Sequence, residues 1–302
     1  MTFEEAERLH VTGHYKEVLE VALREQSQAI MDGCKEDLVS WSYLAVLGCR
    51  DLGRTTEALT HARWAVDVAQ TLDNASLLCL ARYALALAHR SERDLESSLQ
   101  QLRAALEVLP AGTCDPLRAT IHLETAETCL EAGLKPEAEA ALARGGALVH
   151  WLRSPRLLSW CLFLRSRWEI DAAADLQLSA AYEISRTVDC PELQWRILWR
   201  LAELAGKQGR TRMEEEFLWN AFEILAKLSA PLDTGDATAF WRQGPRRAFH
   251  EAIRTRFGGQ FLQKAMAEGA PETENATRII RDLGFDPASI PEFGRRRVAP
   301  QQ

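Results

Sequence analysis

The chain has 302 residues, of which 47% are apolar and 26% are charged, a composition that excludes wholesale disorder. Its 17 glycines and 11 prolines are few enough to favour long helices over a turn-rich β-sandwich or barrel. The 43 acidic residues outnumber the 36 lysines and arginines, giving a net charge of −7, and so disfavour a nucleic-acid-binding protein with a broad cationic face.

Cysteine usage and the N-terminal sequence point to the cytoplasm. The seven cysteines are odd in number, form no Cys-x-x-Cys pair and mostly lie among apolar residues, so we expect free thiols in a reducing compartment. Residues 1–13 lack the apolar core of a signal peptide. No stretch approaches the roughly 18 to 20 apolar residues that span a bilayer, so we expect no membrane insertion.

A turn followed by a helix rich in small residues recurs along the chain. Successive copies lie 40 residues apart, with one step of 36; the copies begin at Gly13, Gly53, Arg93, Gly133, Glu169 and Gly209. Five residues into most copies stands a small apolar or hydroxyl residue, as at Ala58 and Ala138. Two helices pack closely where neither carries a bulky side chain. Each copy therefore predicts a pair of antiparallel helices.

Apolar spacing and proline positions predict the helices in chain order. First helices are expected at 40–52, 75–90, 116–132, 155–169 and 191–207, and second helices at 56–72, 95–109, 136–152, 172–188 and 212–229. Three first helices begin with proline, which is tolerated there because the first helical N–H needs no partner. The predicted fold class is all-α: a right-handed solenoid of about six antiparallel helical hairpins, spanning residues 3–230.

The remaining residues are expected to cap the array and then leave it. Residues 231–244 are rich in turn-forming types but include Phe240 and Trp241, and an apolar stripe predicts a helix at 245–257 that Gly258 and Gly259 end. We interpret residues 231–268 as a C-terminal cap. Residues 269–302, interrupted by four prolines, are predicted to form a largely irregular, mobile tail.

The repeat resembles the tetratricopeptide repeat. Gly13-x-Tyr15, Leu201-Ala202 and the alanines Ala58, Ala65, Ala138 and Ala221 match that family's turn and its small-residue positions. The resemblance covers residues 3–228, although the period of about 40 residues exceeds the family's usual 34. It implies a superhelix whose first helices line a concave, ligand-binding surface. The Lys and Asn set with which some members grip a C-terminal carboxylate is not recognisable here.

No catalytic or cofactor signature is found. The sequence has no phosphate-binding loop of the Gly-x-x-x-x-Gly-Lys type, no Gly-x-Gly-x-x-Gly turn and no His-Glu-x-x-His pair. His10 and His14 stand four apart, but the turn at Gly13 separates them and no further ligands are evident. We expect a protein that is not an enzyme, with no catalytic residue, metal or cofactor.

Counting along the first helices places aromatic and basic residues on the expected inner face. The candidate partner-binding residues are Tyr43, Arg50, Tyr83, Arg90, Trp160, Phe163, Arg167, Arg196, Trp199, Arg200 and Lys207. Arginines bind carboxylates with two hydrogen bonds, and aromatic rings bury large areas at little entropy cost. Interhelical packing remains the alternative for Trp160 and Trp199.

These residues predict an adaptor or scaffold whose concave face binds a protein or peptide partner. The bound segment of that partner is expected to carry acidic and apolar side chains. Two alternatives stay open. One is a regulatory sensor that binds a signalling peptide or small molecule, and the other is a self-assembling structural protein that uses residues 270–302 to dock on a second copy.

Overall fold

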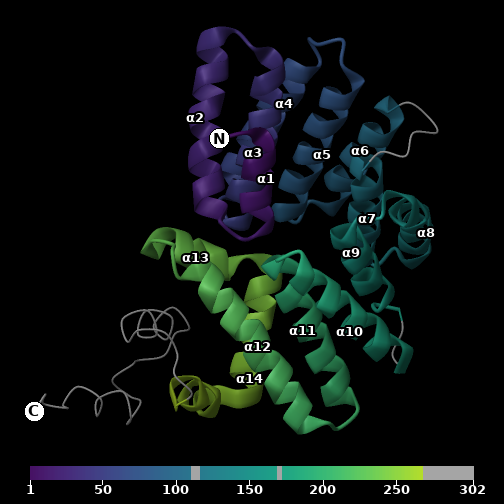
Figure 1. The fold of residues 1–302 in the computed structure, drawn as a ribbon, viewed down its shortest axis with the longest axis vertical. Helices are drawn as coiled ribbons and strands as arrows, with labels where there is room; N and C mark the ends of the chain where they lie inside the picture. Colours follow the sequence, from purple (N-terminus) through teal and green to yellow (C-terminus); the bar gives the residue numbers. More distant parts are fainter. Residues whose placement is uncertain (110–115, 169–171, 268–302) are drawn as a thin grey trace, which may run out of the picture.

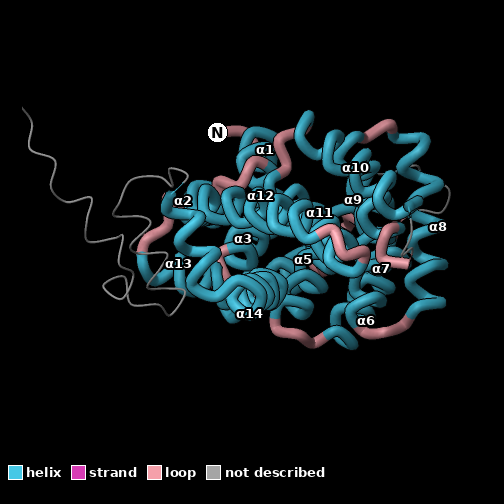
Figure 2. The backbone as a smooth tube through the Cα atoms, turned by 90° about the horizontal axis from the view of Figure 1, so that it is seen from below, coloured by secondary structure: helices cyan, strands magenta, loops and turns pink. Residues whose placement is uncertain are grey.

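The computed structural model describes residues 1–109, 116–168 and 172–267, and these residues form fourteen helices and no strand (Figure 2). The N-terminal half contains α1 (Phe3–Val11), α2 (Tyr15–Asp32), α3 (Lys35–Asp51), α4 (Thr55–Ala69), α5 (Ala75–Ser91), α6 (Leu95–Val108) and α7 (Pro116–Glu131). The C-terminal half contains α8 (Lys135–Leu152), α9 (Pro155–Arg165), α10 (Ala172–Thr187), α11 (Pro191–Lys207), α12 (Thr211–Ser229), α13 (Thr234–Arg242) and α14 (Gly244–Ala267).

The predicted turns recur with one geometry. The residues at positions 13, 53, 93, 133 and 209 all have positive φ, between 67° and 89°, and four of them are glycines. At each turn two backbone N–H groups bond back to the preceding helix, as Gly53 does to Arg50 and Arg54 to Cys49. Such bonds satisfy carbonyls at a helix end. The copy at residue 169 lies outside the described residues.

Neighbouring helices pack in sequence order, as an all-α solenoid requires. Each helix from α1 to α11 packs against the next one, and α1, α3, α5, α7 and α9 also pack in succession. The small residues at the predicted positions, Ala58, Ser98, Ala138, Ala174 and Ala221 among them, have no exposed surface. An added Cβ at Gly48 would lie 2.9 Å from the Leu19 side chain, so α2 and α3 approach at a position where only glycine fits.

The two ends of the described array meet. In Figure 1 the hairpins run in order from α1 to α9 and the chain then returns beneath them, so that α12 and α13 lie below α1 and α2. An added Cβ at Gly13 would lie 2.2 Å from Leu228 on α12, and one at Gly53 would lie 2.5 Å from the Ala239 carbonyl oxygen on α13. Two ion pairs join the same ends, Lys16–Asp233 at 2.9 Å and Arg54–Asp236 at 2.7 Å. The described chain therefore closes on itself.

The C-terminal cap region differs from its predicted form. The turn-rich stretch contains α13, which Asp233 caps by accepting a hydrogen bond from the N–H of Asp236. Helix α14 continues through Gly258 and Gly259 to Ala267, because glycine lowers helix propensity without breaking the hydrogen-bonding pattern. The tail predicted at 269–302 lies outside the described residues.

Three helix boundaries also shift. Helix α3 begins at Lys35, five residues before its predicted start, and α9 ends at Arg165, four residues before its predicted end. Helix α4 ends at Ala69. Such shifts are expected, because apolar spacing locates a helix better than it locates its ends. Within the described ranges, no helix combines the length and the apolar content that crossing a bilayer requires.

Candidate functional site

The first helices of successive hairpins surround a cavity of about 210 Å³, here called the central cavity. Its wall is contributed mainly by α1, α3, α5, α7, α9 and α11. Tyr15 at the start of α2, Gln243 and the first two residues of α14, Gly244 and Pro245, complete it. The polar lining residues are Glu7, His10, Tyr15, Tyr43, Arg50, Asp51, Tyr83, Arg90, Ser91, Arg93, Glu124, Glu127, Glu131, Arg156, Trp160, Glu192, Arg196 and Gln243. Both signs of charge are therefore abundant around one small space.

Three glutamates on one face of α7 hold two arginines. Glu124, Glu127 and Glu131 follow one another at steps of three and four residues, which places them on one side of the helix. Arg90 on α5 pairs with all three carboxylates, at 3.0 Å to Glu127 and 2.7 Å to Glu131. Arg196 on α11 also pairs with Glu127, while its guanidinium lies 5.0 Å from the Phe163 ring centre. These ion pairs tie α5, α7 and α11 together across the cavity.

Asp51 at the end of α3 forms a second cluster. Its carboxylate receives two hydrogen bonds from Arg50, both 2.9 Å long, and one contact from His10 Nε2 at 2.6 Å. Although burial alone would raise it, Arg50 and His10 hold the pKa of Asp51 well below its usual value. Burial lowers the pKa of His10, against the opposing effect of Asp51. A neutral His10 donating Nε2–H to an ionised Asp51 follows from these two directions.

Arg246 joins α14 to the end of α3 and to the start of α11. The side chain is 1% exposed, and its guanidinium donates to the Asp51 carbonyl oxygen at 2.6 Å and to Glu192 Oε2 at 2.7 Å. The same group stacks 3.7 Å from the Phe240 ring centre. The Gln243 side chain also donates to the Arg50 carbonyl oxygen. One wall of the cavity is thus fixed by contacts between residues almost two hundred positions apart.

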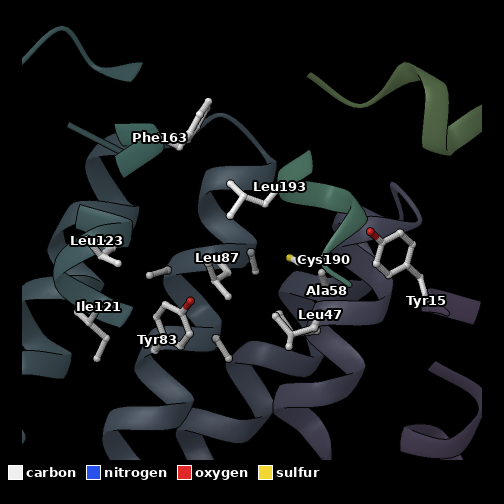
Figure 3. Packing of buried hydrophobic residues seen from close by; sticks show 14 of the residues in the cluster. Tyr15, Leu47, Ala58, Tyr83, Leu87, Ile121, Leu123, Phe163, Cys190 and Leu193 are labelled. Carbon is white, nitrogen blue, oxygen red and sulfur yellow. The ribbon is translucent and has the colours of Figure 1, made fainter. Parts of the chain in front are cut away.

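The rest of the lining is apolar and aromatic. Figure 3 shows Leu193 and Cys190 lying across from Leu87 and Leu47, with the ring of Tyr83 below Leu87. All five side chains are buried. Burial raises the pKa of Tyr83 well above its usual value, so its hydroxyl stays protonated and can donate or accept a hydrogen bond.

Six of the eleven residues predicted to bind a partner line the central cavity: Tyr43, Arg50, Tyr83, Arg90, Trp160 and Arg196. Trp160 also donates its indole N–H to Glu127 at 2.9 Å.

The other five predicted residues, Phe163, Arg167, Trp199, Arg200 and Lys207, do not line the cavity. Phe163 is 3% exposed, Trp199 packs between Trp195 and Phe249, and Arg200 pairs with Glu203 at 2.8 Å. Packing is the arrangement found for Trp199.

Several cavity residues were absent from the predicted set. Glu7, His10, Tyr15 and Asp51 come from the first hairpin and the end of α3, and Glu192 comes from the start of α11. The spacing of Glu124, Glu127 and Glu131 can be read from the sequence, and it indicates that these three carboxylates share one face of α7. No sequence pattern predicts that residues of the returning chain, such as Glu192 and residues 243–245, line the cavity, because they reach it only when the array closes.

Comparison of the chain with known protein families, with curated proteins and with solved structures finds no match. Within the part of the chain that the structure describes, no three histidine, cysteine or acidic side chains are arranged to hold a metal ion.

Proposed function

We propose that this chain is a non-enzymatic binding protein and that the central cavity takes a small ligand or the end of a peptide. The observation that carries the proposal is the central cavity itself: the described array closes on itself, and side chains from six successive first helices surround a space of about 210 Å³. Binding sites are commonly concave and apolar, with a few polar groups that orient the ligand. The buried leucines and tyrosines, together with the charged groups around them, provide both kinds of surface.

We propose that binding in the cavity serves a regulatory or sensory role. We infer a right-handed superhelix of the tetratricopeptide kind from the repeated turn and from the hairpins packed in order. A ligand between the first helices would contact several hairpins together and would stabilise the closed form relative to an open one. A cytoplasmic location, expected from the cysteines, belongs to the same proposal.

A cavity-filling variant tests the proposal. Ser91 lines the cavity at the end of α5, whereas Ser76 is exposed near the start of the same helix. The wild-type chain is screened by thermal unfolding with amino acids, short peptides, nucleotides, sugars and fatty acids. We expect at least one compound to raise the Tm, because a ligand of the folded state alone stabilises it.

The Ser91→Phe variant should lose that rise in Tm while Ser76→Phe keeps it. A rise that persists in folded Ser91→Phe protein would place the binding site elsewhere. A screen in which no compound raises the wild-type Tm would count against the proposal.

A second candidate function is that of a protein adaptor. Exposed apolar side chains on α8, α9 and α10 favour it. Trp151 at the end of α8 is 76% exposed, and a groove lined by Val149, Leu158 and Ile184 lies where α8, α9 and α10 meet. Exposed apolar clusters often mark protein-binding surfaces. An adaptor of this kind should lose its partner in Trp151→Ala and keep it in Ser91→Phe.

A further inference from the structure

Most of the charged groups around the central cavity already have partners of opposite sign. Arg90 and Arg196 pair with the α7 glutamates, Arg50 pairs with Asp51, and Glu192 pairs with Arg246. Arg93 also lines the cavity without an ion pair to a described residue, but it adds to Arg90 in lowering the pKa of Glu131 against the opposing effect of burial, so its charge already acts on that carboxylate. Removing one member of a buried pair leaves the other uncompensated and is costly. A ligand is therefore not expected to recruit these groups.

Glu7 on α1 and Arg156 on α9 differ from the others. Both line the central cavity, yet neither side chain forms an ion pair or hydrogen bond with a described residue. Burial raises the pKa of Glu7, and Arg156 is the main group that opposes this effect, so the two charges lie close enough to interact. Arg156 is exposed and Glu7 is half-buried, so solvent reaches at least one of the two charges. Two opposite charges are thus available without breaking an existing pair.

Aromatic and apolar side chains near Glu7 and Arg156 could contact the uncharged part of a small ligand. The rings of Tyr43 and Tyr83 lie 6.1 Å apart, and neither hydroxyl bonds to a described residue. Glu7 raises the pKa of Tyr43, after burial, and Arg156 lowers it, so Tyr43 lies within reach of both charges. Leu47, Leu87 and Leu193 supply an apolar wall in the same cavity.

We propose that the central cavity binds a small zwitterion with an apolar side chain: a free α-amino acid, or the shortest peptide with both ends free. The ligand's ammonium group binds Glu7 and its carboxylate binds Arg156, while the side chain lies on the leucines. This inference rests on the proposed function and names its ligand class. A ligand with only an anion would leave Glu7 uncompensated, and a ligand with only a cation would face Arg156 and Arg50.

The volume agrees with a ligand of this size. The cavity of about 210 Å³ lies below the roughly 300 to 1,000 Å³ of sites for drug-sized molecules. It is far larger than the ~10–15 Å³ that a single water needs on this measure. The cavity therefore has room for a molecule of several heavy atoms that is smaller than a drug-sized ligand.

Calorimetric titration of the full chain with L-leucine and Leu-Leu, and with leucinamide and N-acetylleucine, tests the assignment. Leucinamide lacks the carboxylate and N-acetylleucine lacks the ammonium group. We expect L-leucine or Leu-Leu to bind at least tenfold more tightly than both blocked compounds. Equal affinity for the free and blocked compounds would overturn the assignment.

Two variants and two matched controls locate the charges. Glu7→Gln and Arg156→Gln should each weaken binding of the free zwitterion about tenfold or more, the loss of one charged contact. Arg165→Gln, on the same helix as Arg156 but outside the central cavity, and Glu20→Gln, exposed on α2, should leave the affinity unchanged. Circular dichroism confirms that each variant is folded. Unchanged affinity in both folded cavity variants would also overturn the assignment.

The outcome separates this inference from the proposed function. If no leucine compound binds but another compound raises the Tm in a manner that Ser91→Phe abolishes, the zwitterion assignment is wrong and the cavity remains a binding site. If no compound of any class raises the Tm, both fail.

Discussion

His122 on α7 shows how one buried residue makes the fold sensitive to acid. The side chain is 9% exposed and packs beside Gly145 on α8, so a positive charge there would lose most of its hydration. Burial, followed by the nearby Arg144 and Arg118, lowers the pKa of His122 to about 4. An unfolded chain would hold this histidine near its ordinary pKa of about 6.5. The folded form therefore binds fewer protons than the unfolded form between these values.

The direction of the pH dependence follows from this difference. The stability contribution is fully present above pH 6.5 and is lost as the pH falls toward 4, by at most about 1.4 kcal/mol per pH unit. We predict that His122→Gln flattens the loss of unfolding free energy between pH 6.5 and pH 4.5. Urea denaturation at pH 7.5, 6.0 and 5.0 measures it. Parallel stability curves for wild type and variant would contradict the assignment.

At the scale of an element, α14 is held to the array by aromatic packing. Phe249 has no exposed surface, and its ring lies 5.7 Å from that of Trp195 and 5.6 Å from that of Trp199 on α11. We predict that Phe249→Ala lowers the free energy of unfolding by about 3–5 kcal/mol, the usual cost of emptying a buried phenylalanine site. Chemical denaturation of the purified variant measures the change.

The matched control for Phe249→Ala is on the same helix. Arg247 is exposed, and its ion pair with Glu251 at 2.8 Å is open to water. Surface pairs of this type contribute little to stability, so Arg247→Ala should resemble the wild type. A similar loss in both variants would mean that α14 is stabilised by helix formation alone and not by its contact with α11.

The elements themselves were largely predictable from the sequence, because local rules specify them. Proline at the start of α7, α9 and α11 marks three helix starts, and the spacing of glycine and alanine marks the turns. Helix α13 was missed because Thr234 and Gly235 favour a turn locally. Its formation depends on the Asp233 cap and on burial of Phe240 and Trp241, and the burial is a property of the folded array.

At the scale of the molecule, closure of the array could not be predicted. The contacts that make it join Gly13 and Gly53 to residues near 228 and 239, and no local spacing rule connects such distant positions. For the same reason, part of the candidate site could not be predicted from local spacing. Tyr83 and Arg90 were placed by counting along α5, whereas Glu192 and the segment 243–245 reach the cavity only because the chain returns.

Alanine substitutions at two glycines with almost equal backbone conformations can distinguish the effect of array closure from the effect of local backbone strain. Gly53 and Gly133 have φ of 78° and 76°, so alanine at either position costs roughly 1–2 kcal/mol of backbone strain. An added Cβ at Gly53 would also lie 2.5 Å from the Ala239 carbonyl oxygen, whereas one at Gly133 would have no described atom within 4 Å. Only the first substitution forces α13 away from the N-terminal hairpins.

We predict that Gly133→Ala lowers the Tm modestly and keeps the wild-type radius of gyration. Gly53→Ala should lower the Tm further and increase the radius, because the ends of the array separate while each hairpin persists. Small-angle scattering measures the radius, and circular dichroism checks that helix content is retained. Identical scattering curves for the two variants would mean that the contact at Ala239 does not hold the array closed. Since the central cavity takes part of its wall from the returning chain, Gly53→Ala should also weaken any ligand that Ser91→Phe excludes, and Gly133→Ala should not.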